Sequence, residues 1–254
     1  MSTAILSLEE VGKAFGGLQV IDGVSFEVRR GSRTALIGPN GAGKTTVFNL
    51  ISGVYPVDRG RIVLDGTDIT TVPSRQRVRH GLARSFQNIR LMAHLSALEN
   101  VLLGAHARLP LLARARAPAA VRDAEAALHD AGLALYTGQR VSNLPYGVQK
   151  RIEVVRALLA RPRLLLLDEP AAGLNPAETD ELRQLLERVS GAGVTLLVVE
   201  HDMNFVHRLC EQVVVLNFGR RIFEGPPQAV MRDRQVRAAY LGSAADPQDA
   251  ERAR

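Results

Sequence analysis

One stretch of the sequence decides the fold class: Gly38-Pro39-Asn40-Gly41-Ala42-Gly43-Lys44-Thr45-Thr46. The residues before it, Thr34-Ala35-Leu36-Ile37, are typical of a short buried strand, and a helix is predicted from about Lys44 to Ser52. Glycines in such a loop let the backbone bend so that its N–H groups converge on phosphate oxygens. A strand, a G-x-x-x-x-G-K-[ST] loop and a helix in this order predict a nucleotide site.

The chemistry of this loop assigns a role to each polar residue. The helix that begins near Lys44 directs its positive end toward a bound phosphate. The Lys44 ammonium can reach the β- and γ-phosphates of ATP, and the Thr45 hydroxyl can ligate Mg²⁺. The alternative is an ordinary turn before a helix, and the preceding buried strand weighs against it.

Two carboxylates follow a later apolar strand, Leu164 to Leu167. Ligands of open α/β sheets bind beyond the carboxyl ends of the strands, so Asp168 is predicted to hold Mg²⁺, directly or through water. Glu169 is predicted to polarise the attacking water. The alternative is that the two acids are simply solvated at the entrance of a loop. The presence of the phosphate loop favours the catalytic interpretation. His201 follows another apolar strand, at 194–199, and is predicted to sense the γ-phosphate at the same edge.

Strands alternate with helices along most of the chain. Strands are predicted around 5–8, 24–28 and 61–65, and a helix from about Ala177 to Val189 separates the two later strands. Buried strands in this arrangement indicate a parallel sheet covered on both faces. This pattern predicts an α/β fold with a mostly parallel sheet, and the full fold class predicted is a P-loop (RecA-like) core with, in addition, an antiparallel β subdomain.

The middle of the chain is rich in Ala and Leu at helical spacing and is predicted to be an inserted helical subdomain, 88–159. The whole chain, 1–254, then forms a single nucleotide-binding domain whose α/β core comprises 1–87 and 160–243. Inside the insertion, the basic segment from Arg108 to Arg122 is predicted to be a long surface connection. The polar residues 244–254 are predicted to be a disordered tail.

Composition narrows the classes of function. The net charge of +6 is carried almost entirely by Arg and suits nucleic acid, anionic lipid headgroups or phosphate ligands. Aromatic residues make up 4% of the chain and Trp is absent, which argues against a stacking platform for single-stranded nucleic acid. Cys210 is the single cysteine, so it forms no intramolecular disulfide and is expected to lie in the core. Neither a signal peptide nor a run of about 20 apolar residues is found, so a cytoplasmic protein is expected.

Six elements at this spacing resemble the ATPases of ABC transporters. They are the 38–46 loop, Gln87 in Arg84-Ser85-Phe86-Gln87-Asn88, the 144–151 segment, Asp168-Glu169-Pro170, the 173–176 segment and His201. The resemblance covers about Leu6 to Gly242 and implies ATP and Mg²⁺ as cofactors. It implies that Phe15 stacks on adenine, and that Gln87 joins the Mg²⁺–water shell to a membrane subunit and takes part in catalysis.

The same resemblance identifies residues 144–148 as a signature loop. It implies that Pro145, Tyr146 and Gly147 contact the γ-phosphate bound by a second subunit, so that the protein acts as a dimer. A helix predicted from about Val148 to Ala160 would direct its positive end at that phosphate. The sequence departs from the family's Leu-Ser-Gly-Gly-Gln at Pro145 and Val148. Asn175 stands where many relatives carry Asp.

More narrowly, the chain resembles the ATP-binding subunits of branched-chain amino acid uptake systems. This implies transmembrane permeases as partners, a second and different ATPase subunit, and indirectly a periplasmic solute-binding protein. It also implies a position on the inner face of the plasma membrane and no nucleic acid partner. Two alternatives are a soluble ABC ATPase acting on nucleic acid or ribosomes, and the ATPase of a lipopolysaccharide exporter.

Overall fold

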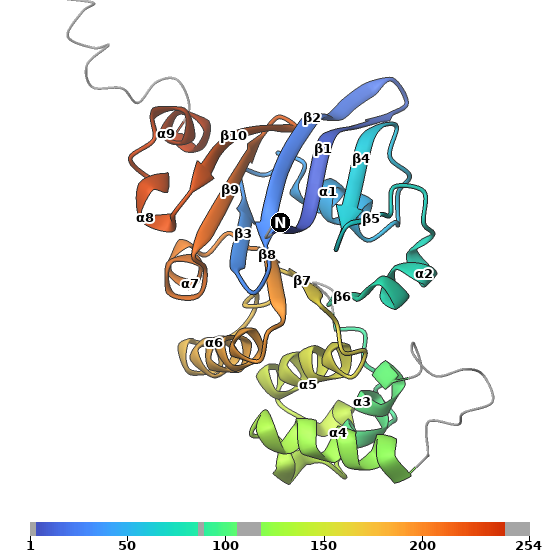
Figure 1. Ribbon diagram of the computed structural model, residues 1–254. Helices are drawn as coiled ribbons and strands as arrows, with labels where there is room; N and C mark the ends of the chain where they lie inside the picture. Colours follow the sequence, from blue (N-terminus) through green and yellow to red (C-terminus); the bar gives the residue numbers. More distant parts are fainter. Residues whose placement is uncertain (1–3, 86–88, 106–117, 242–254) are drawn as a thin grey trace, which may run out of the picture.

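The computed structural model describes residues 4–85, 89–105 and 118–241. These residues form an α/β structure with two sheets, and a group of helices lies below the sheets in Figure 1. Among the described residues, no helix combines the length and the apolar character that crossing a bilayer requires.

The larger sheet has six strands in the order β10-β9-β3-β8-β7-β6. All neighbours in it are parallel except β10, which runs antiparallel to β9. The carboxyl ends of its central strands therefore share one edge. Its strands are β3 (Arg33–Ile37), β6 (Leu82–Arg84), β7 (Leu164–Asp168), β8 (Thr195–Val199), β9 (Gln212–Asn217) and β10 (Arg220–Gly225).

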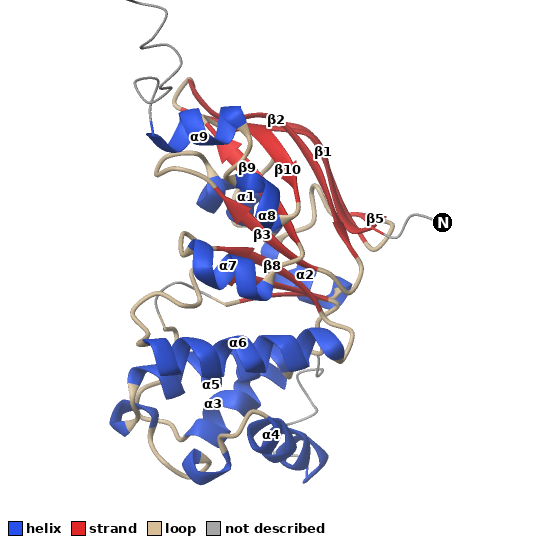
Figure 2. Ribbon diagram, turned by 90° about the vertical axis from the view of Figure 1, so that its left-hand side faces the viewer, coloured by secondary structure: helices blue, strands red, loops and turns tan. Residues whose placement is uncertain are grey.

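The smaller sheet has four antiparallel strands in the order β2-β1-β4-β5. They are β1 (Ala4–Phe15), β2 (Leu18–Arg29), β4 (Arg59–Leu64) and β5 (Thr67–Asp68). Helix α1 (Lys44–Ile51) packs between the two sheets, because its buried side chains join one apolar cluster with residues of both. Figure 2 shows this layered arrangement, which fixes α1 and the loop before it.

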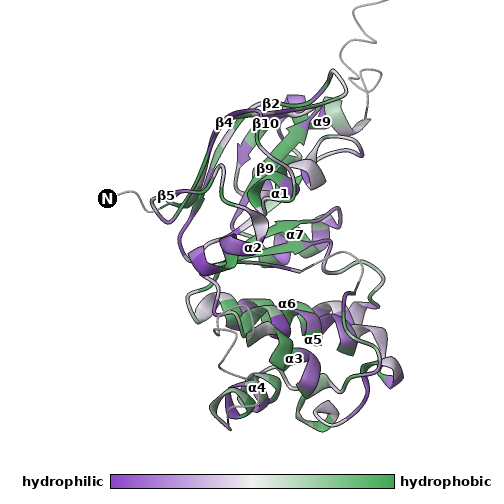
Figure 3. Ribbon diagram, turned by 90° about the vertical axis from the view of Figure 1, so that its right-hand side faces the viewer, coloured by the Kyte–Doolittle hydropathy of each residue, from purple (hydrophilic) through white to green (hydrophobic). Residues whose placement is uncertain are grey.

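Helices cover the other face of the six-stranded sheet. A second apolar cluster joins α6 (Pro176–Gly191) and α7 (Met203–Leu209) with α3 (Ala97–Ala105), α4 (Pro118–Asp130) and α5 (Tyr146–Leu158). Figure 3 shows hydrophobic and hydrophilic segments alternating along the ribbons of these helices. Shorter elements complete the chain: α2 (Ser74–Arg77), η1 (Val78–His80), η2 (Ala134–Tyr136), η3 (Val141–Asn143), α8 (Pro227–Val230) and α9 (Arg234–Leu241).

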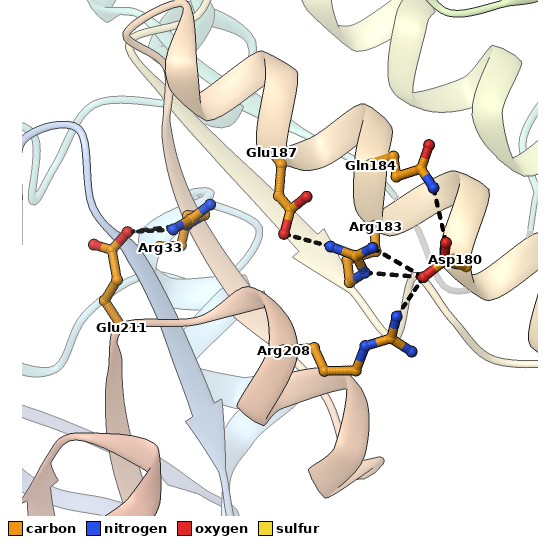
Figure 4. A network of polar contacts seen from close by, with 7 residues as sticks. All are labelled: Arg33, Asp180, Arg183, Gln184, Glu187, Arg208 and Glu211. Atoms are coloured by element: carbon orange, nitrogen blue, oxygen red, sulfur yellow. Dashed lines mark hydrogen bonds and ion pairs between the residues drawn. The ribbon is translucent and has the colours of Figure 1, made fainter.

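A polar network ties α6 to α7 (Figure 4). Asp180 of α6 accepts hydrogen bonds from Arg183 and Gln184 of the same helix and from Arg208 of α7, at 2.9, 2.8 and 2.5 Å. The three donors hold the pKa of Asp180 below its ordinary value, the Arg183 side chain having the largest effect. The network therefore fixes α7, which follows His201, against α6.

The structure confirms the predicted fold class and refines its elements. The strands predicted around 5–8 and 24–28 belong to one hairpin of two 12-residue strands, whose register shifts at several irregularities. Strands β5, β6, β9 and β10 were not predicted. The predicted surface connection is wrong at its end, because Pro118 to Arg122 form the first turns of α4. Residues 106–117, Gln87 and the 244–254 tail lie outside the described residues.

Candidate functional site

The phosphate loop connects β3 to α1 as predicted and follows a tight path. Gly38 and Gly43 both have positive φ angles, 153° and 100°. A Cβ atom at Gly38 would lie 2.2 Å from the Leu216 carbonyl oxygen, and one at Gly43 would lie 2.5 Å from Cδ1 of Ile21. Both positions therefore require glycine. The Ala42 carbonyl accepts a hydrogen bond from Gly219 in the β9–β10 turn, which holds the loop from the far side.

The first turn of α1 is positively polarised. It contains no acidic residue and no side chain caps it at Gly43, so its N–H groups point into the loop. The Lys44 Nζ donates to the carbonyl oxygens of Gly38 and Pro39 at 2.7 and 3.0 Å, which places the ammonium inside the loop. Burial lowers the pKa of Lys44, and the negative charge of Glu169 opposes this shift. Thr45 is exposed on the same turn.

Asp168 is the last residue of β7 and is buried. Its Oδ2 accepts a hydrogen bond from Nη2 of Arg84, on the neighbouring strand β6, at 2.7 Å. The other amino group of Arg84, Nη1, donates to Asn49 Oδ1 and Ser52 Oγ near the end of α1, at 2.7 and 2.9 Å. One carboxylate oxygen of Asp168 is thus held by Arg84, which the sequence had identified only as part of a motif.

Glu169 and His201 face each other across two strand ends. The His201 Nδ1 lies 3.9 Å from Oε2 of Glu169 and 3.9 Å from Oε2 of Glu200. Glu169 has a φ angle of 45°, and its N–H donates to the Val199 carbonyl at 2.9 Å. Strained backbone of this kind persists where the surrounding structure fixes it, often at active sites. The structure therefore brings together Lys44, Asp168, Glu169 and His201, as the sequence predicted.

Glu200 is a site residue that the sequence reasoning missed. Its side chain is buried, and its carboxylate accepts hydrogen bonds from the backbone N–H groups of Ala171 and His201 at 2.9 and 3.0 Å. Burial raises the pKa of Glu200, although these N–H groups oppose the shift. The Glu200 carboxylate thus connects the segment after Glu169, at Ala171, to the turn that carries His201. A glutamate directly before a loop histidine was the available signal.

Lys150 of α5 was also missed. Its side chain is buried, and burial lowers its pKa, while the charges of Glu153, Glu200, Asp168 and Glu169 oppose that shift. The Lys150 ammonium nitrogen lies 5.8 Å from the centre of the Tyr146 ring, at the start of the same helix. The sequence around Lys150 does not indicate that it is buried near acidic residues, because Asp168, Glu169 and Glu200 come from other segments of the chain.

The residues predicted to form the signature loop lie at the start of α5. Pro145 is the N-cap and Tyr146 the first helical residue, two residues earlier than predicted. Tyr146 lies beside Gly173, and Gly147 is buried against Glu178 of α6. These residues pack on the segment after Glu169 and on α6, and their contact with a second subunit stays a prediction.

Phe15 closes the hairpin of β1 and β2, where it pairs with Leu18. Phe15 is 40% exposed, and its ring makes an edge-to-face contact with that of Tyr55, the ring centroids 5.1 Å apart. The same hairpin passes the phosphate loop, since the Val20 carbonyl and Ile21 lie against Gly43. An exposed aromatic ring on this hairpin suits the adenine contact predicted for Phe15.

These residues suit a magnesium nucleotide. The loop supplies N–H donors and an ammonium for phosphate oxygens. Exposed Thr45 has a hydroxyl oxygen and Asp168, at the carboxyl end of β7, has a carboxylate, and oxygen ligands are the type that Mg²⁺ prefers. A nucleotide-binding α/β ATPase is the class that this fold and site define.

Comparison with protein families agrees with this class. The ABC transporter family model matches residues 21–172, more than half of the chain. The model for the branched-chain amino acid ATP-binding cassette transporter matches residues 220–246. The chain belongs to the ABC transporter family.

Curated relatives match nearly the whole chain. The high-affinity branched-chain amino acid transport ATP-binding protein BraF of Pseudomonas aeruginosa is 40% identical, covering 96% of this chain and 100% of the relative. LivG of Escherichia coli, named for the same transport, is 38% identical with the same coverage. The lipopolysaccharide export ATP-binding protein LptB of Escherichia coli is 33% identical, covering 94% of this chain and 98% of the relative.

Solved structures agree with the fold. A nucleotide-free ATP-binding cassette of an ABC transporter superposes with a TM-score of 0.87 at 28% identity, covering 94% of this chain and 100% of that one. The ADP conformation of an ATP-binding cassette gives a TM-score of 0.87 at 29% identity, covering 95% of this chain and 100% of that one. The chain is thus an ATP-binding cassette ATPase.

Proposed function

We propose that this chain binds and hydrolyses ATP on the inner face of the plasma membrane to drive uptake of branched-chain amino acids through transmembrane permeases. The single observation that supports hydrolysis most strongly is the meeting of the phosphate loop, Asp168, Glu169 and His201 at one sheet edge. The substrate rests on similarity to BraF and LivG over the full length of those relatives.

Each residue at the edge has a task in this mechanism. The loop N–H groups and Lys44 hold the phosphates, while Thr45 and Asp168, with Gln87, would hold Mg²⁺, which neutralises phosphate charge when bound. Glu169 orients the attacking water and accepts its proton. His201, fixed through Glu200 and α7, hydrogen-bonds the γ-phosphate and registers its loss.

The proposed mechanism needs a second ATPase subunit. The positive end of α5, with Pro145, Tyr146 and Gly147, would complete the site of the opposite subunit. Closing of the dimer around ATP changes the conformation of the permeases, because the γ-phosphate is bound chiefly in the closed state. A periplasmic binding protein delivers the solute.

A heterodimer fits the sequence better than a homodimer. Pro145 replaces the signature serine, so the loop offers backbone donors and no hydroxyl. A hydrogen bond to a charged group is worth about 1.5–3 kcal/mol, and a partner with the serine would supply it at one of the two sites. Lipopolysaccharide export is the second candidate, favoured by the similarity to LptB.

Reconstitution in liposomes tests the proposal. The neighbouring permeases, a second ATPase and the binding protein are assembled with this chain, and uptake of radiolabelled leucine is measured with ATP inside. We expect uptake that Lys44→Ala abolishes and that Arg33→Gln, at the opposite end of β3 from the loop, leaves intact. Transport of lipopolysaccharide instead of leucine would favour the second candidate, and ATP-independent uptake would contradict both.

The same assembly tests the pairing. Permeases with this chain alone should transport leucine poorly, and adding the second ATPase should restore uptake. Full uptake without a second ATPase would contradict the heterodimer. With the partner present, Pro145→Ser should raise the ATPase rate if the missing hydroxyl limits closure.

A further inference from the structure

Arg84 is a charged residue that has no role in the proposed mechanism. It lies on β6, directly beside β7, and only 10% of its side chain is exposed, against 8% for Asp168. Its guanidinium carbon lies 5.8 Å from the centre of the Phe48 ring of α1. It is therefore a buried cation between the strand that carries Asp168 and the helix that carries the phosphate-binding lysine.

The contacts of Arg84 satisfy both of its amino groups. Nη2 donates to Asp168, and Nη1 donates to Asn49 and Ser52. The Ser52 hydroxyl in turn donates to the Phe48 carbonyl at 2.8 Å. A buried ion pair persists only when such additional hydrogen bonds offset the loss of water, and removing one partner leaves an uncompensated buried charge.

The positive charge of Arg84 would repel a Mg²⁺ ion at the Asp168 carboxylate. Mg²⁺ held by Asp168 would share this carboxylate with the Arg84 guanidinium, and like charges repel strongly between side chains that are largely shielded from water. Arg84 also holds Oδ2, so one oxygen of the carboxylate is engaged before any metal binds. The pair therefore stabilises the metal-free fold and weakens the attraction of the site for a divalent cation.

We propose that Arg84 is the internal counter-ion of Asp168 and competes with Mg²⁺ for its carboxylate. Arg84 keeps the buried charge of Asp168 compensated when no metal is bound and lowers the affinity of the site for Mg²⁺. It is a positioning residue, because it acts through Asp168 and contacts neither the phosphates nor the attacking water. The inference rests on the proposed role of Asp168 as a metal ligand.

The test uses the full chain, MgCl₂ and a non-hydrolysable ATP analogue, so that turnover plays no part. Mg²⁺ affinity is measured by calorimetry at saturating analogue, and stability by thermal unfolding with EDTA and with MgCl₂. For Arg84→Gln we expect a Tm several degrees lower in EDTA, a larger rise in Tm on adding Mg²⁺ than in the wild type, and Mg²⁺ bound about tenfold more tightly.

Three further variants separate charge from packing. Arg84→Lys keeps the charge, so its Mg²⁺ affinity should stay within about threefold of the wild type. Asn49→Ala removes one hydrogen-bond partner of Arg84 but leaves the charge of Arg84 in place. It should therefore lower the Tm by the same amount with and without metal. Arg33→Gln breaks the ion pair with Glu211, 2.6 Å long and remote from Asp168, and should change neither quantity.

Two results would overturn the inference. The first is a Tm of Arg84→Gln that falls by the same amount with EDTA and with MgCl₂, which would indicate a purely structural role. The second is an Mg²⁺ affinity of Arg84→Gln that is equal to or weaker than that of the wild type. If Arg84→Gln does not fold, the double variant Arg84→Gln/Asp168→Asn removes both charges: it should fold, and failure to fold also counts against the idea. A wild-type protein that binds the analogue without any Mg²⁺ dependence would refute the proposed function as well.

Discussion

The carboxyl group of Glu178 lies directly against the backbone of Gly147, although the two residues belong to different helices. A Cβ atom at Gly147 would lie 2.6 Å from Cδ of Glu178. The same side chain accepts a hydrogen bond from the Asn175 N–H at 3.0 Å, and Asn175 Oδ1 accepts one from the Glu178 N–H at 3.0 Å, which forms the capping box of α6. The start of α5 is thus packed on the cap of α6.

Gly147→Ala should destabilise the protein through this contact. The added methyl group displaces Glu178 and breaks the capping box, which costs about 0.5–2 kcal/mol. Gly191→Ala is the matched control, because no atom lies within 4 Å of a Cβ there, and it should leave stability unchanged or slightly raised. Urea unfolding measures both. Shortening Glu178 to Ala should remove most of the cost of Gly147→Ala, and full additivity of the two changes would contradict the contact.

Glu169→Gln should separate ATP binding from hydrolysis. The amide keeps the shape of the side chain but cannot accept a proton, so turnover should fall about 10²–10⁴-fold while ATP affinity stays within a few-fold of the wild type. Phosphate release and nucleotide binding are the two measurements. Glu187→Gln, a glutamate of α6 that pairs with Arg183, is the control and should turn over normally. Hydrolysis at the wild-type rate in Glu169→Gln would remove Glu169 from the mechanism.

Phe15→Ala should lower ATP affinity modestly. Loss of an aromatic stacking face costs about 0.5–1.5 kcal/mol, and the ring stands exposed on the hairpin beside Tyr55. Leu18→Ala, the exposed partner of Phe15 across the hairpin, provides the control. Titration with a fluorescent ATP analogue gives both affinities. Equal affinities in the wild type and Phe15→Ala would place the adenine elsewhere, for example on Val20.

The parts of the site that the sequence predicted depend on local order along the chain. The phosphate loop and the acids after β7 follow buried strands directly, and parallel strands bring their carboxyl ends to one edge. Asp168, Glu169 and Lys44 could therefore be placed together from spacing alone. Three strands of the antiparallel sheet were predicted around 5–8, 24–28 and 61–65, but their register was not, because bulges between β1 and β2 shift it.

The parts that were missed depend on partners far away in sequence. Arg84 contacts Asn49 and Asp168, which lie 35 and 84 residues away in the sequence. A short sequence motif cannot predict contacts between residues so far apart. The hydrogen bonds that hold Glu200 come from backbone N–H groups, which leave no pattern in the side chains beyond its place directly before His201. β9 contains the apolar run Val213 to Leu216, a strand signal that the sequence reasoning did not use, whereas β10 is mostly polar and its place follows only from its pairing with β9.

Arg77→Ala should destabilise the fold more than its place on a short helix suggests. The side chain is buried, and burial lowers its pKa to about 10, so it stays protonated at neutral pH. It donates to four backbone carbonyl groups, two of them at the end of α1: Leu50, Ile51, Thr70 and Val72. A cation at a helix C-terminus is favourable, and each buried carbonyl left unpaired costs about 1–3 kcal/mol.

The expected loss for Arg77→Ala is therefore about 3 kcal/mol or more, measured by urea unfolding. Arg75→Ala, on the exposed side of the same helix, is the matched control and should change stability by less than about 0.5 kcal/mol. Similar effects from the two substitutions would show that the four hydrogen bonds of Arg77 contribute little.

Cys210 predicts a pH dependence that one substitution can isolate. Burial raises the pKa of its thiol from 9.0 to about 12. Above pH 9 the unfolded chain loses the thiol proton while the folded protein retains it, so the folded state binds more protons and stability falls as pH rises. The fall begins near pH 9 and amounts to about 1.4 kcal/mol for each further pH unit until the folded thiol itself ionises.

Comparison with Cys210→Ala removes the contributions of every other titrating group. Urea unfolding of both proteins between pH 7 and pH 10 should show the wild type losing about 1 kcal/mol more than the variant by pH 10, with parallel curves below pH 8. A thiol reagent at pH 8 should modify Cys210 only after unfolding, because the folded thiol is both buried and protonated. Parallel stability curves up to pH 10, or rapid labelling of the folded protein, would contradict the raised pKa.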